Sequence, residues 1–117
     1  MLSIHLHNVI FFAYHGLYEH EKINGNEFEV NVSVDYQPSD GVISNIENTI
    51  NYVDVFQLVQ QRMSMATPLL ETVVMDIAGQ IIARFSLAEK VSVSIKKLNP
   101  PIKDFRGTVG VSFTVSR

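Results

Sequence analysis

The sequence contains no cysteine, and this absence excludes several kinds of site. None of its 117 residues can form a disulfide, act as a thiolate nucleophile, or hold zinc or an iron–sulfur cluster through sulfur. A chain without disulfides fits a reducing compartment, so we expect a cytoplasmic protein.

Positive charge is also scarce. The chain has 9 Lys and Arg against 12 Asp and Glu, for a net charge of -3. Because general nucleic-acid-binding domains are normally basic, we expect no nucleic-acid partner. Residues 90–117 nevertheless hold six of the basic side chains and a single acid, Asp104, which leaves a local positive patch possible.

Long apolar runs are missing too. The longest, from Val9 to Tyr14, is far shorter than the roughly 18 residues that a membrane-spanning helix needs. The N-terminal residues show no basic segment followed by an apolar stretch, so we expect neither a membrane anchor nor an export signal. With 46% hydrophobic residues the chain can still build one core, and its length predicts a single domain over residues 1–117.

Four segments alternate apolar and polar side chains with the period of two that is typical of strands with one buried face. They are residues 3–13, 28–36, 91–96 and 109–115. In the first segment the alternation slips near Asn8, which predicts a β-bulge. Residues 38–41, Pro-Ser-Asp-Gly, are predicted to break the chain after the second strand.

Two segments between the second and third strands have a helical period instead. Their apolar side chains recur three or four positions apart, beginning near Asn51. They are Val55, Leu58, Val59 and Met63 in the first helix and Leu70, Val73, Val74, Ile77, Ala78, Ile81 and Phe85 in the second. Thr67 and Pro68 are the predicted N-cap and first residue of the second helix.

The order strand, strand, helix, helix, strand, strand predicts an α+β fold in which both helices cover the apolar face of a four-stranded antiparallel sheet. The other face carries small polar residues: Asn31, Ser33, Ser92, Ser94, Gly110, Ser112 and Thr114. Such a sheet has two open edges, which invite pairing with another copy of the chain. Closing several sheets into a ring removes these edges, so the pattern favours a homo-oligomer.

Lys97 is the first candidate for chemistry. It shares the strand parity of the apolar residues Val93 and Ile95, which places it on the apolar side of the sheet, whereas Lys96 points to the other side. A lysine that is partly desolvated there can act as a general base or acid near neutral pH. The alternative is a structural lysine whose stem covers the sheet edge.

Several other residues are candidate ligands. Glu71 lies in the first turn of the second helix, where the helix dipole stabilises an acidic side chain. The functional alternative is that its carboxylate accepts paired hydrogen bonds from a guanidine-like ligand edge. Glu21 lies in an acidic loop, residues 18–22, of a kind that often binds ligands. His5 and His7 share a strand face, but no third ligand stands out beside them, so we expect no metal site.

Five motifs follow one another along the chain. They are Phe12-Ala13-Tyr14-His15-Gly16 with Glu21 following, Gly25-Asn26-Glu27-Phe28, Asn48-Thr49-Ile50-Asn51-Tyr52, Leu69-Leu70-Glu71, and Lys97-Leu98-Asn99-Pro100-Pro101-Ile102. Each motif alone is weakly specific. In this order and spacing they resemble the dihydroneopterin aldolase family of the folate pathway, over essentially the whole chain. The resemblance implies a tunnelling fold, in which the sheets of several subunits form a barrel with the helices outside, as tetrameric rings that stack into octamers.

The resemblance also implies the reaction. The family is expected to cleave the side chain of the small-molecule substrate 7,8-dihydroneopterin by a retro-aldol reaction, giving 6-hydroxymethyl-7,8-dihydropterin and glycolaldehyde. Such lyases need no metal, Schiff base or other cofactor, because a carbon–nitrogen double bond of the pterin ring takes up the electrons. We therefore expect a metal-independent enzyme without a cofactor.

The resemblance assigns roles to individual residues. Lys97 is the implied proton-transfer group, Tyr52 its partner from a neighbouring subunit, and Glu21 the carboxylate that orients side-chain hydroxyls and water. The implied pterin slot consists of the anchor Glu71 and the lining residues Thr49, Ile50 and Leu70.

Two other functions stay open. A dihydroneopterin triphosphate 2′-epimerase uses similar acid–base chemistry, and the basic excess in residues 90–117 suits a triphosphate. The aldolase itself can epimerise its substrate, because the cleaved fragments can recombine. The alternative from another class is a catalytically silent ring that binds pterins or purines. That alternative gives no reason for the set Glu21, Tyr52, Glu71 and Lys97.

Overall fold

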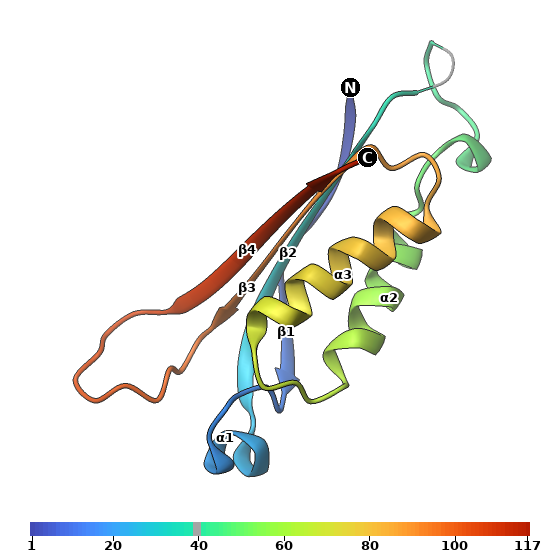
Figure 1. The fold of residues 1–117 in the computed structure, drawn as a ribbon. Coiled ribbons are helices and arrows are strands. Elements are labelled where there is room, and N and C mark those ends of the chain that lie inside the picture. The colour runs from blue at the N-terminus through green and yellow to red at the C-terminus, as the bar shows by residue number, and fades with distance from the viewer. Residues whose placement is uncertain (39–40) are drawn as a thin grey trace.

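In residues 1–38 and 41–117, which the computed structural model describes, four strands form one antiparallel sheet. They are β1 (Leu2–Ala13), β2 (Asn26–Tyr36), β3 (Lys90–Lys97) and β4 (Val109–Ser116), each beside the next in chain order. The helices are α1 (Glu19–Asn24), the 3₁₀ helix η1 (Ile46–Asn48), α2 (Tyr52–Met63) and α3 (Leu70–Arg84). The predicted α+β class and the order of the strands and long helices are confirmed (Figure 1). The predicted break at residues 38–41 includes residues 39 and 40, which lie outside the described residues.

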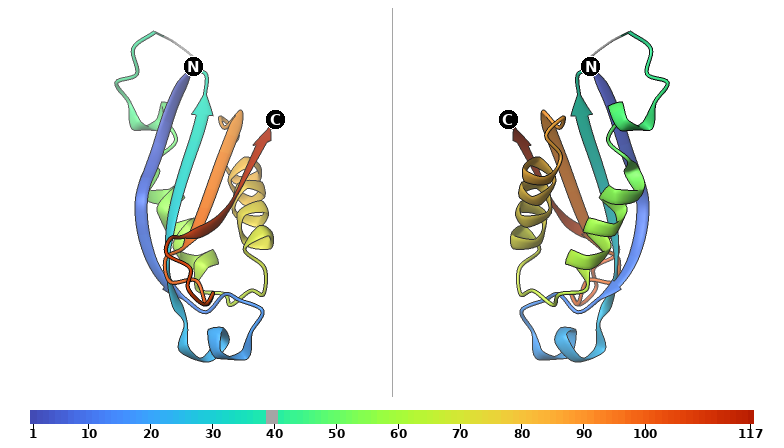
Figure 2. Two further views of the ribbon diagram at one scale, coloured as in Figure 1. Left: turned by 90° about the vertical axis from the view of Figure 1, so that its left-hand side faces the viewer. Right: turned by 90° about the vertical axis from the view of Figure 1, so that its right-hand side faces the viewer.

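The two long helices lie on the same face of the sheet. Figure 2 shows α2 and α3 side by side behind the strands, with α3 over β3 and β4 and α2 against β1. Because α2 and α3 run in opposite directions, the start of α3 lies near the end of α2, at the end of the molecule that also holds α1 (Figure 1). The start of α2 and η1 lie at the other end.

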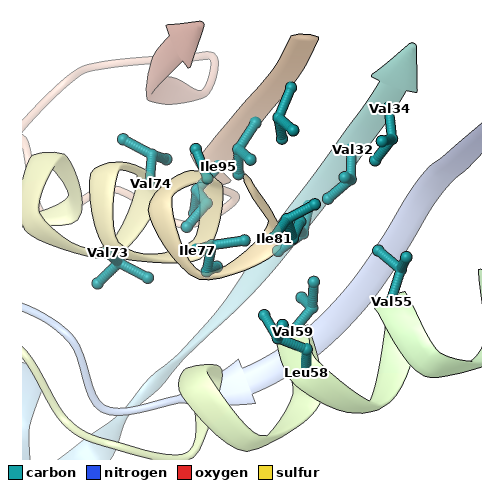
Figure 3. Close-up of a cluster of buried hydrophobic side chains, with 14 of the residues drawn as sticks. Val32, Val34, Val55, Leu58, Val59, Val73, Val74, Ile77, Ile81 and Ile95 are labelled. Atoms are coloured by element: carbon teal, nitrogen blue, oxygen red, sulfur yellow. The ribbon is translucent and has the colours of Figure 1, made fainter. Parts of the chain in front are cut away.

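The core lies between the helix pair and the sheet. Figure 3 shows the side chains of Val73, Ile77 and Ile81 from α3 gathered with those of Val59 from α2 and Ile95 from β3. All the predicted apolar helix positions are buried except Leu70 and Phe85, which are half-buried at the two ends of α3. Full burial of one such side chain stabilises the fold by about 1.5–3 kcal/mol. The periodicity of the sequence therefore identified the packed faces of both helices.

The predicted bulge in β1 is confirmed. Leu6 pairs with Val32 and Val9 with Val30, so two residues of β1, His7 and Asn8, lie opposite a single residue of β2. Asn8 takes a left-handed backbone conformation with φ of 54°, which asparagine tolerates better than most residues. The bulge shifts the parity of β1 by one position, and this shift keeps the apolar residues on both sides of it facing the helices.

The face of the sheet turned away from the helices is polar, as the sequence predicted. Side-chain hydrogen bonds join neighbouring strands across it, from Ser3 to Asp35 at 2.6 Å and between Ser92 and Thr114 at 2.9 Å. Within the described part of the chain, β1 pairs only with β2 and β4 only with β3. Both outer strands therefore keep an open edge.

Two local predictions are wrong. Helix α3 begins at Leu70 with Leu69 as its N-cap residue, so Thr67 is not the cap. The Thr67 hydroxyl is used elsewhere: its oxygen accepts a hydrogen bond from Arg62 Nη1 at 3.0 Å, and the hydroxyl donates to the carbonyl oxygen of Met65 at 2.8 Å. The prediction of residues 18–22 as an acidic loop is wrong as well, because most of this segment lies in α1 and Glu21 is buried.

Candidate active site

A buried ion pair joins the last residue of β3 to α1. Lys97 Nζ donates a hydrogen bond to Glu21 Oε2, and only 12% of the lysine side chain and 5% of the glutamate side chain are exposed. Lys97 pairs in register with Phe28, which is fully buried under the helices. The predicted parity of Lys97 is therefore correct. Its partner Glu21, 76 residues earlier in the chain, is not the exposed loop residue that its sequence context indicated.

The turn before α1 holds the Glu21 carboxylate in place. The Tyr18 backbone N–H donates to Glu21 Oε1 at 3.4 Å, and Gly16 lies directly against the carboxyl group. A Cβ atom at Gly16 would come within 2.5 Å of Glu21 Cδ, so no larger residue fits there. Burial raises the pKa of Glu21, but the hydrogen bond and charge of Lys97 and the Tyr18 N–H outweigh it and hold the pKa below its ordinary value. The carboxylate is therefore ionised at neutral pH.

Glu71 and Leu70 meet this pair at a common cleft. The cleft has a volume of about 370 Å³ and is lined by Glu21, Lys97, Leu70 and Glu71. Apolar residues of the connection between β3 and β4, Pro100 to Ile102, form another part of its wall. Glu71 is exposed in the first turn of α3, where the helix dipole favours a carboxylate. The cleft thus combines an exposed carboxylate, a buried lysine–carboxylate ion pair and an apolar wall.

Thr49, Ile50 and Tyr52 lie elsewhere. Thr49 and Ile50 border a second cavity, of about 400 Å³, together with residues 84–87 at the end of α3. Along α3, Glu71 lies about 20 Å from Arg84, which borders this cavity, at 1.5 Å per residue. Tyr52 is the first residue of α2, at the same end of the molecule, and is 62% exposed. A single chain therefore does not bring all the predicted site residues together.

Ile50 cannot contact a ligand through its side chain. Only 3% of the residue is exposed, because the side chain belongs to the core. The next residue, Asn51, caps α2 by accepting a hydrogen bond from the Val53 N–H at 2.9 Å. Ile50 can therefore take part in binding only through its backbone.

His15 is a buried polar residue that the sequence analysis quoted within a motif but gave no role. It is 1% exposed, its ring packs edge-on against Phe28, and its Nδ1 accepts a hydrogen bond from the Thr67 N–H at 3.1 Å. Burial and the nearby positive charges of Arg62 and Lys97 lower the pKa of His15 to about 4. No local pattern identifies such a residue, because its partner lies 52 residues away.

His5 and His7 lie far from this cleft, on the polar face of β1. Their rings stack with centroids 5.0 Å apart, and His5 Nδ1 is 2.8 Å from Ser33 Oγ. Across residues 1–38 and 41–117, no group of three His, Cys, Asp or Glu residues is placed to hold a metal ion. In the same residues, no helix has the length and apolar character needed to cross a membrane.

The antiparallel sheet, the helix pair on one face and the lysine–carboxylate cleft define a subunit of the tunnelling-fold class. A family model for dihydroneopterin aldolase matches residues 4–114, and the chain belongs to this family. It is 32% identical over 120 residues to a dihydroneopterin aldolase of Streptococcus pyogenes, with all of both chains covered.

Solved structures share the fold. The Escherichia coli dihydroneopterin aldolase in complex with neopterin has a TM-score of 0.88 at 17% identity, with 99% of this chain and 100% of that one covered. A Burkholderia dihydroneopterin aldolase bound to guanine has a TM-score of 0.79 at 19% identity, with 99% and 91% covered. The family, the fold class and the aldolase activity, that of a lyase in folate biosynthesis, are those that the sequence predicted.

Proposed function

We propose that the aldolase reaction takes place in a cleft shared by two subunits. The observation that carries this proposal is the buried Lys97–Glu21 pair, which lines the same cleft as Glu71, while Tyr52 lies at the far end of α3. A site that uses both Lys97 and Tyr52 needs a second copy of the chain. One chain thus supplies the pterin anchor and the acid–base pair, and its neighbour supplies Tyr52.

Glu71 binds the pterin ring in this proposal. A carboxylate accepts two parallel hydrogen bonds from an amino group and an adjacent N–H, which is the edge that a pterin presents. Leu70 lines the ring from the same chain, and Thr49 and the backbone of Ile50 line it from the neighbour. Two relatives support the choice of edge, since one was solved with neopterin and another with guanine. Guanine has the amino–amide edge of a pterin but lacks its side chain.

The chemistry consists of proton transfers at the side chain of 7,8-dihydroneopterin. A proton leaves the 2′-hydroxyl, the bond between C1′ and C2′ breaks, and its electrons pass into the carbon–nitrogen double bond of the ring. Glycolaldehyde departs, and protonation of C1′ gives 6-hydroxymethyl-7,8-dihydropterin. Lys97 moves these protons through a water molecule, Glu21 orients the hydroxyls, and Tyr52 assists at the hydroxyl or at C1′. Because the ring itself accepts the electrons, the step needs neither a metal nor a Schiff base.

Product analysis tests the reaction. We expect the purified chain to release glycolaldehyde from 7,8-dihydroneopterin, measured by trapping the aldehyde and quantifying both products. The same incubation with dihydroneopterin triphosphate examines the epimerase, which the basic excess in residues 90–117 keeps in consideration. Isomers of the triphosphate without any cleavage of 7,8-dihydroneopterin would replace the aldolase with the epimerase. Binding of pterins without turnover would leave a silent binding ring.

Mixed oligomers test the shared site. Tyr52→Ala and Lys97→Ala are each expected to abolish most activity. When the two variants are refolded together, about a quarter of the sites in randomly mixed rings combine an intact Lys97 with an intact neighbouring Tyr52. We therefore expect a corresponding fraction of the wild-type activity to return.

The matched control is the pair Glu21→Ala and Lys97→Ala. Both residues come from the same chain, so no mixed ring contains an intact site and no activity should return. Recovery of activity in this control would show that mixed rings regain activity for a reason other than a Tyr52 contributed by the neighbouring subunit. Failure of the first pair to recover, in rings shown by mass spectrometry to be mixed, would place Tyr52 outside the site.

We also propose that the assembly is a tetrameric ring, stacked into an octamer, in the cytoplasm. The open edges of β1 and β4 and the polar face between them support a closed barrel. The absence of cysteine supports a reducing compartment. Sedimentation of the purified chain as a monomer at micromolar concentration would contradict both the ring and the shared cleft.

A further inference from the structure

The connection between α2 and α3, residues 64–69, ends at the residues that line the cleft. Four hydrogen bonds meet at one of its residues, Thr67, which uses its N–H, its carbonyl oxygen and both capacities of its hydroxyl. Leu70 follows Thr67 by three positions and Glu71 by four. Because four residues span at most about 14 Å of extended chain, fixing Thr67 restricts where Glu71 can lie.

On one side Thr67 is hydrogen-bonded to the turn that precedes α1, the helix that contains Glu21. His15 Nδ1 accepts from the Thr67 N–H at 3.1 Å, and the Gly16 N–H donates to the Thr67 carbonyl oxygen at 3.1 Å. Gly16 in turn lies directly against the Glu21 carboxyl group, with no room for a side chain between them. Gly16 is therefore the single residue that lies between the connection and the carboxyl group of the Lys97–Glu21 pair.

On the other side Thr67 is tied to the helices. Arg62, which is 6% exposed at the end of α2, donates from Nη1 to Thr67 Oγ1 at 3.0 Å and from Nε to Asp76 Oδ2 at 2.5 Å. Asp76 lies on α3, one and a half turns beyond Glu71. This arm fixes the connection to α2 and α3, whereas the arm through His15 fixes it to the turn before α1.

We propose that His15 is a positioning residue of the active site, which sets the spacing between the pterin anchor Glu71 and the Lys97–Glu21 pair by holding Thr67 through its Nδ1. This inference deepens the proposed function and rests on it. Glu71 holds the ring and Lys97 acts on the side chain, so the distance between them decides whether the reacting atoms meet the proton-transfer group. A displacement of about 1 Å can cost roughly 100-fold in rate.

The environment of His15 suits an acceptor that is uncharged at neutral pH. Because Nδ1 accepts the Thr67 N–H, the single proton of the neutral ring is on Nε2. A second proton would have to occupy Nδ1 and would break the tie. Burial, Arg62 and Lys97 keep the pKa of His15 near 4, so the acceptor persists at neutral pH.

The variants His15→Asn and His15→Gln distinguish the role of Nδ1 from that of Nε2. Asn Oδ1 stands the same number of bonds from Cα as His Nδ1, so His15→Asn can still accept from the Thr67 N–H. Glutamine places its polar atoms one bond farther out and cannot accept in the same place. The pair compares two amides of similar polarity that differ in whether the tie is kept.

The test measures kcat with 7,8-dihydroneopterin, and Kd for 6-hydroxymethyl-7,8-dihydropterin, in His15→Ala, His15→Gln and His15→Asn. We expect kcat to fall about 10–100-fold in the Ala and Gln variants and to stay within about threefold of wild type in the Asn variant. Product Kd should change less than about threefold in all of them, because the anchor and the cleft wall remain. Hydrogen exchange of the Thr67 amide should accelerate in the Ala and Gln variants only. If His15→Ala does not fold, the comparison of Gln with Asn decides alone.

Two results would overturn the inference. A lower melting temperature with unchanged kcat in folded His15→Ala or His15→Gln would make His15 a structural residue only. Equal loss of kcat in the Asn and Gln variants would show that Nδ1 is not the group that matters. Failure of the proposed function looks different, since the wild-type chain would then release no glycolaldehyde in the same assay.

Discussion

Replacing Lys97 with alanine is expected to lower kcat by about 10²–10⁴-fold while the chain still binds 6-hydroxymethyl-7,8-dihydropterin. Proton transfer matters only while the carbon–carbon bond breaks and C1′ is protonated, so its loss leaves the binding of the ring intact. The measurement is steady-state kinetics with 7,8-dihydroneopterin together with equilibrium titration of the product by fluorescence. Circular dichroism should accompany it, because Lys97→Ala leaves the buried Glu21 without its partner.

Replacing Glu71 with alanine is expected to have the opposite effect. The ring edge that Glu71 is proposed to bind is the same before and after cleavage, and an interaction that is equal in the ground and transition states affects KM rather than kcat. Loss of two hydrogen bonds to a charged group corresponds to about 3 kcal/mol, or roughly 100-fold weaker product binding. The turnover that remains at saturating substrate should stay near the wild-type value.

Lys96→Ala is the matched control for Lys97. Lys96 is the adjacent residue in β3, but its side chain points to the face away from the helices, where it lies 4.0 Å from Glu29. Its removal should leave kcat unchanged. If Lys96→Ala and Lys97→Ala lowered turnover equally, or if Lys97→Ala lost the product as well, the division between binding and chemistry would be wrong.

Acidification is expected to lower the free energy of unfolding over the pH range between the unfolded and folded pKa values of His15. The pKa of His15 is lowered from 6.5 to about 4, so between these values the unfolded chain binds a proton that the folded chain does not. The stability therefore rises with pH across this window and falls as the pH drops from about 6.5 toward 4. At 1.36 kcal/mol per pKa unit, the loss amounts to roughly 3 kcal/mol over the whole window.

The two perturbed carboxylates act at lower pH. The pKa of Glu21 lies below its ordinary value of 4.5, as the Lys97 and Tyr18 hydrogen bonds outweigh the effect of burial, and the pKa of Asp76 lies below 3.8 through hydrogen bonds with Gln80 and Arg62. Their stabilising contribution is complete above those ordinary values and is lost only as the pH falls through the lowered ones. Above about pH 4.5, the protonation of Glu21 and Asp76 therefore does not contribute to the change in stability.

Urea denaturation at about pH 4.5 and about pH 7, at one protomer concentration, measures this effect. The free energy of unfolding of the wild-type chain should differ between the two by roughly 2–3 kcal/mol more than that of His15→Asn. The asparagine keeps the hydrogen bond to Thr67 but cannot titrate. An identical pH dependence in the two proteins would contradict the lowered pKa.

The fold was predictable where a local period carries the signal. The alternation of residues 28–36 and the helical stripe from Val73 to Ile81 each reflect one buried face, and the slip at Asn8 marks the bulge because parity changes there. The start of α3 was predicted wrongly for a physical reason. Thr67 has the side chain of an N-cap, but Arg62 engages its hydroxyl and His15 its N–H, and these contacts are not local.

The site was predictable only in part. The parity of Lys97 could be counted along β3, but nothing near Glu21 in the sequence indicates that it is buried against a lysine 76 residues away. The separation of Tyr52 from Lys97 follows from the antiparallel packing of α2 and α3, which local patterns do not specify. The role of His15 was not predicted because its Nδ1 accepts a hydrogen bond from a distant backbone N–H. Such a contact produces no periodic pattern in the sequence.

Because only one face of β2 and β3 is packed under helices, we expect neighbouring residues in these strands to tolerate substitution differently. Val32 is 2% exposed in the core, whereas Ser33 lies on the face turned away from the helices. Trimming Val32 leaves a cavity, while a change at Ser33 alters only a surface hydrogen bond. Folding of one subunit therefore constrains the helix-facing layer of the sheet, whereas the constraint on the opposite face comes from assembly into the proposed barrel.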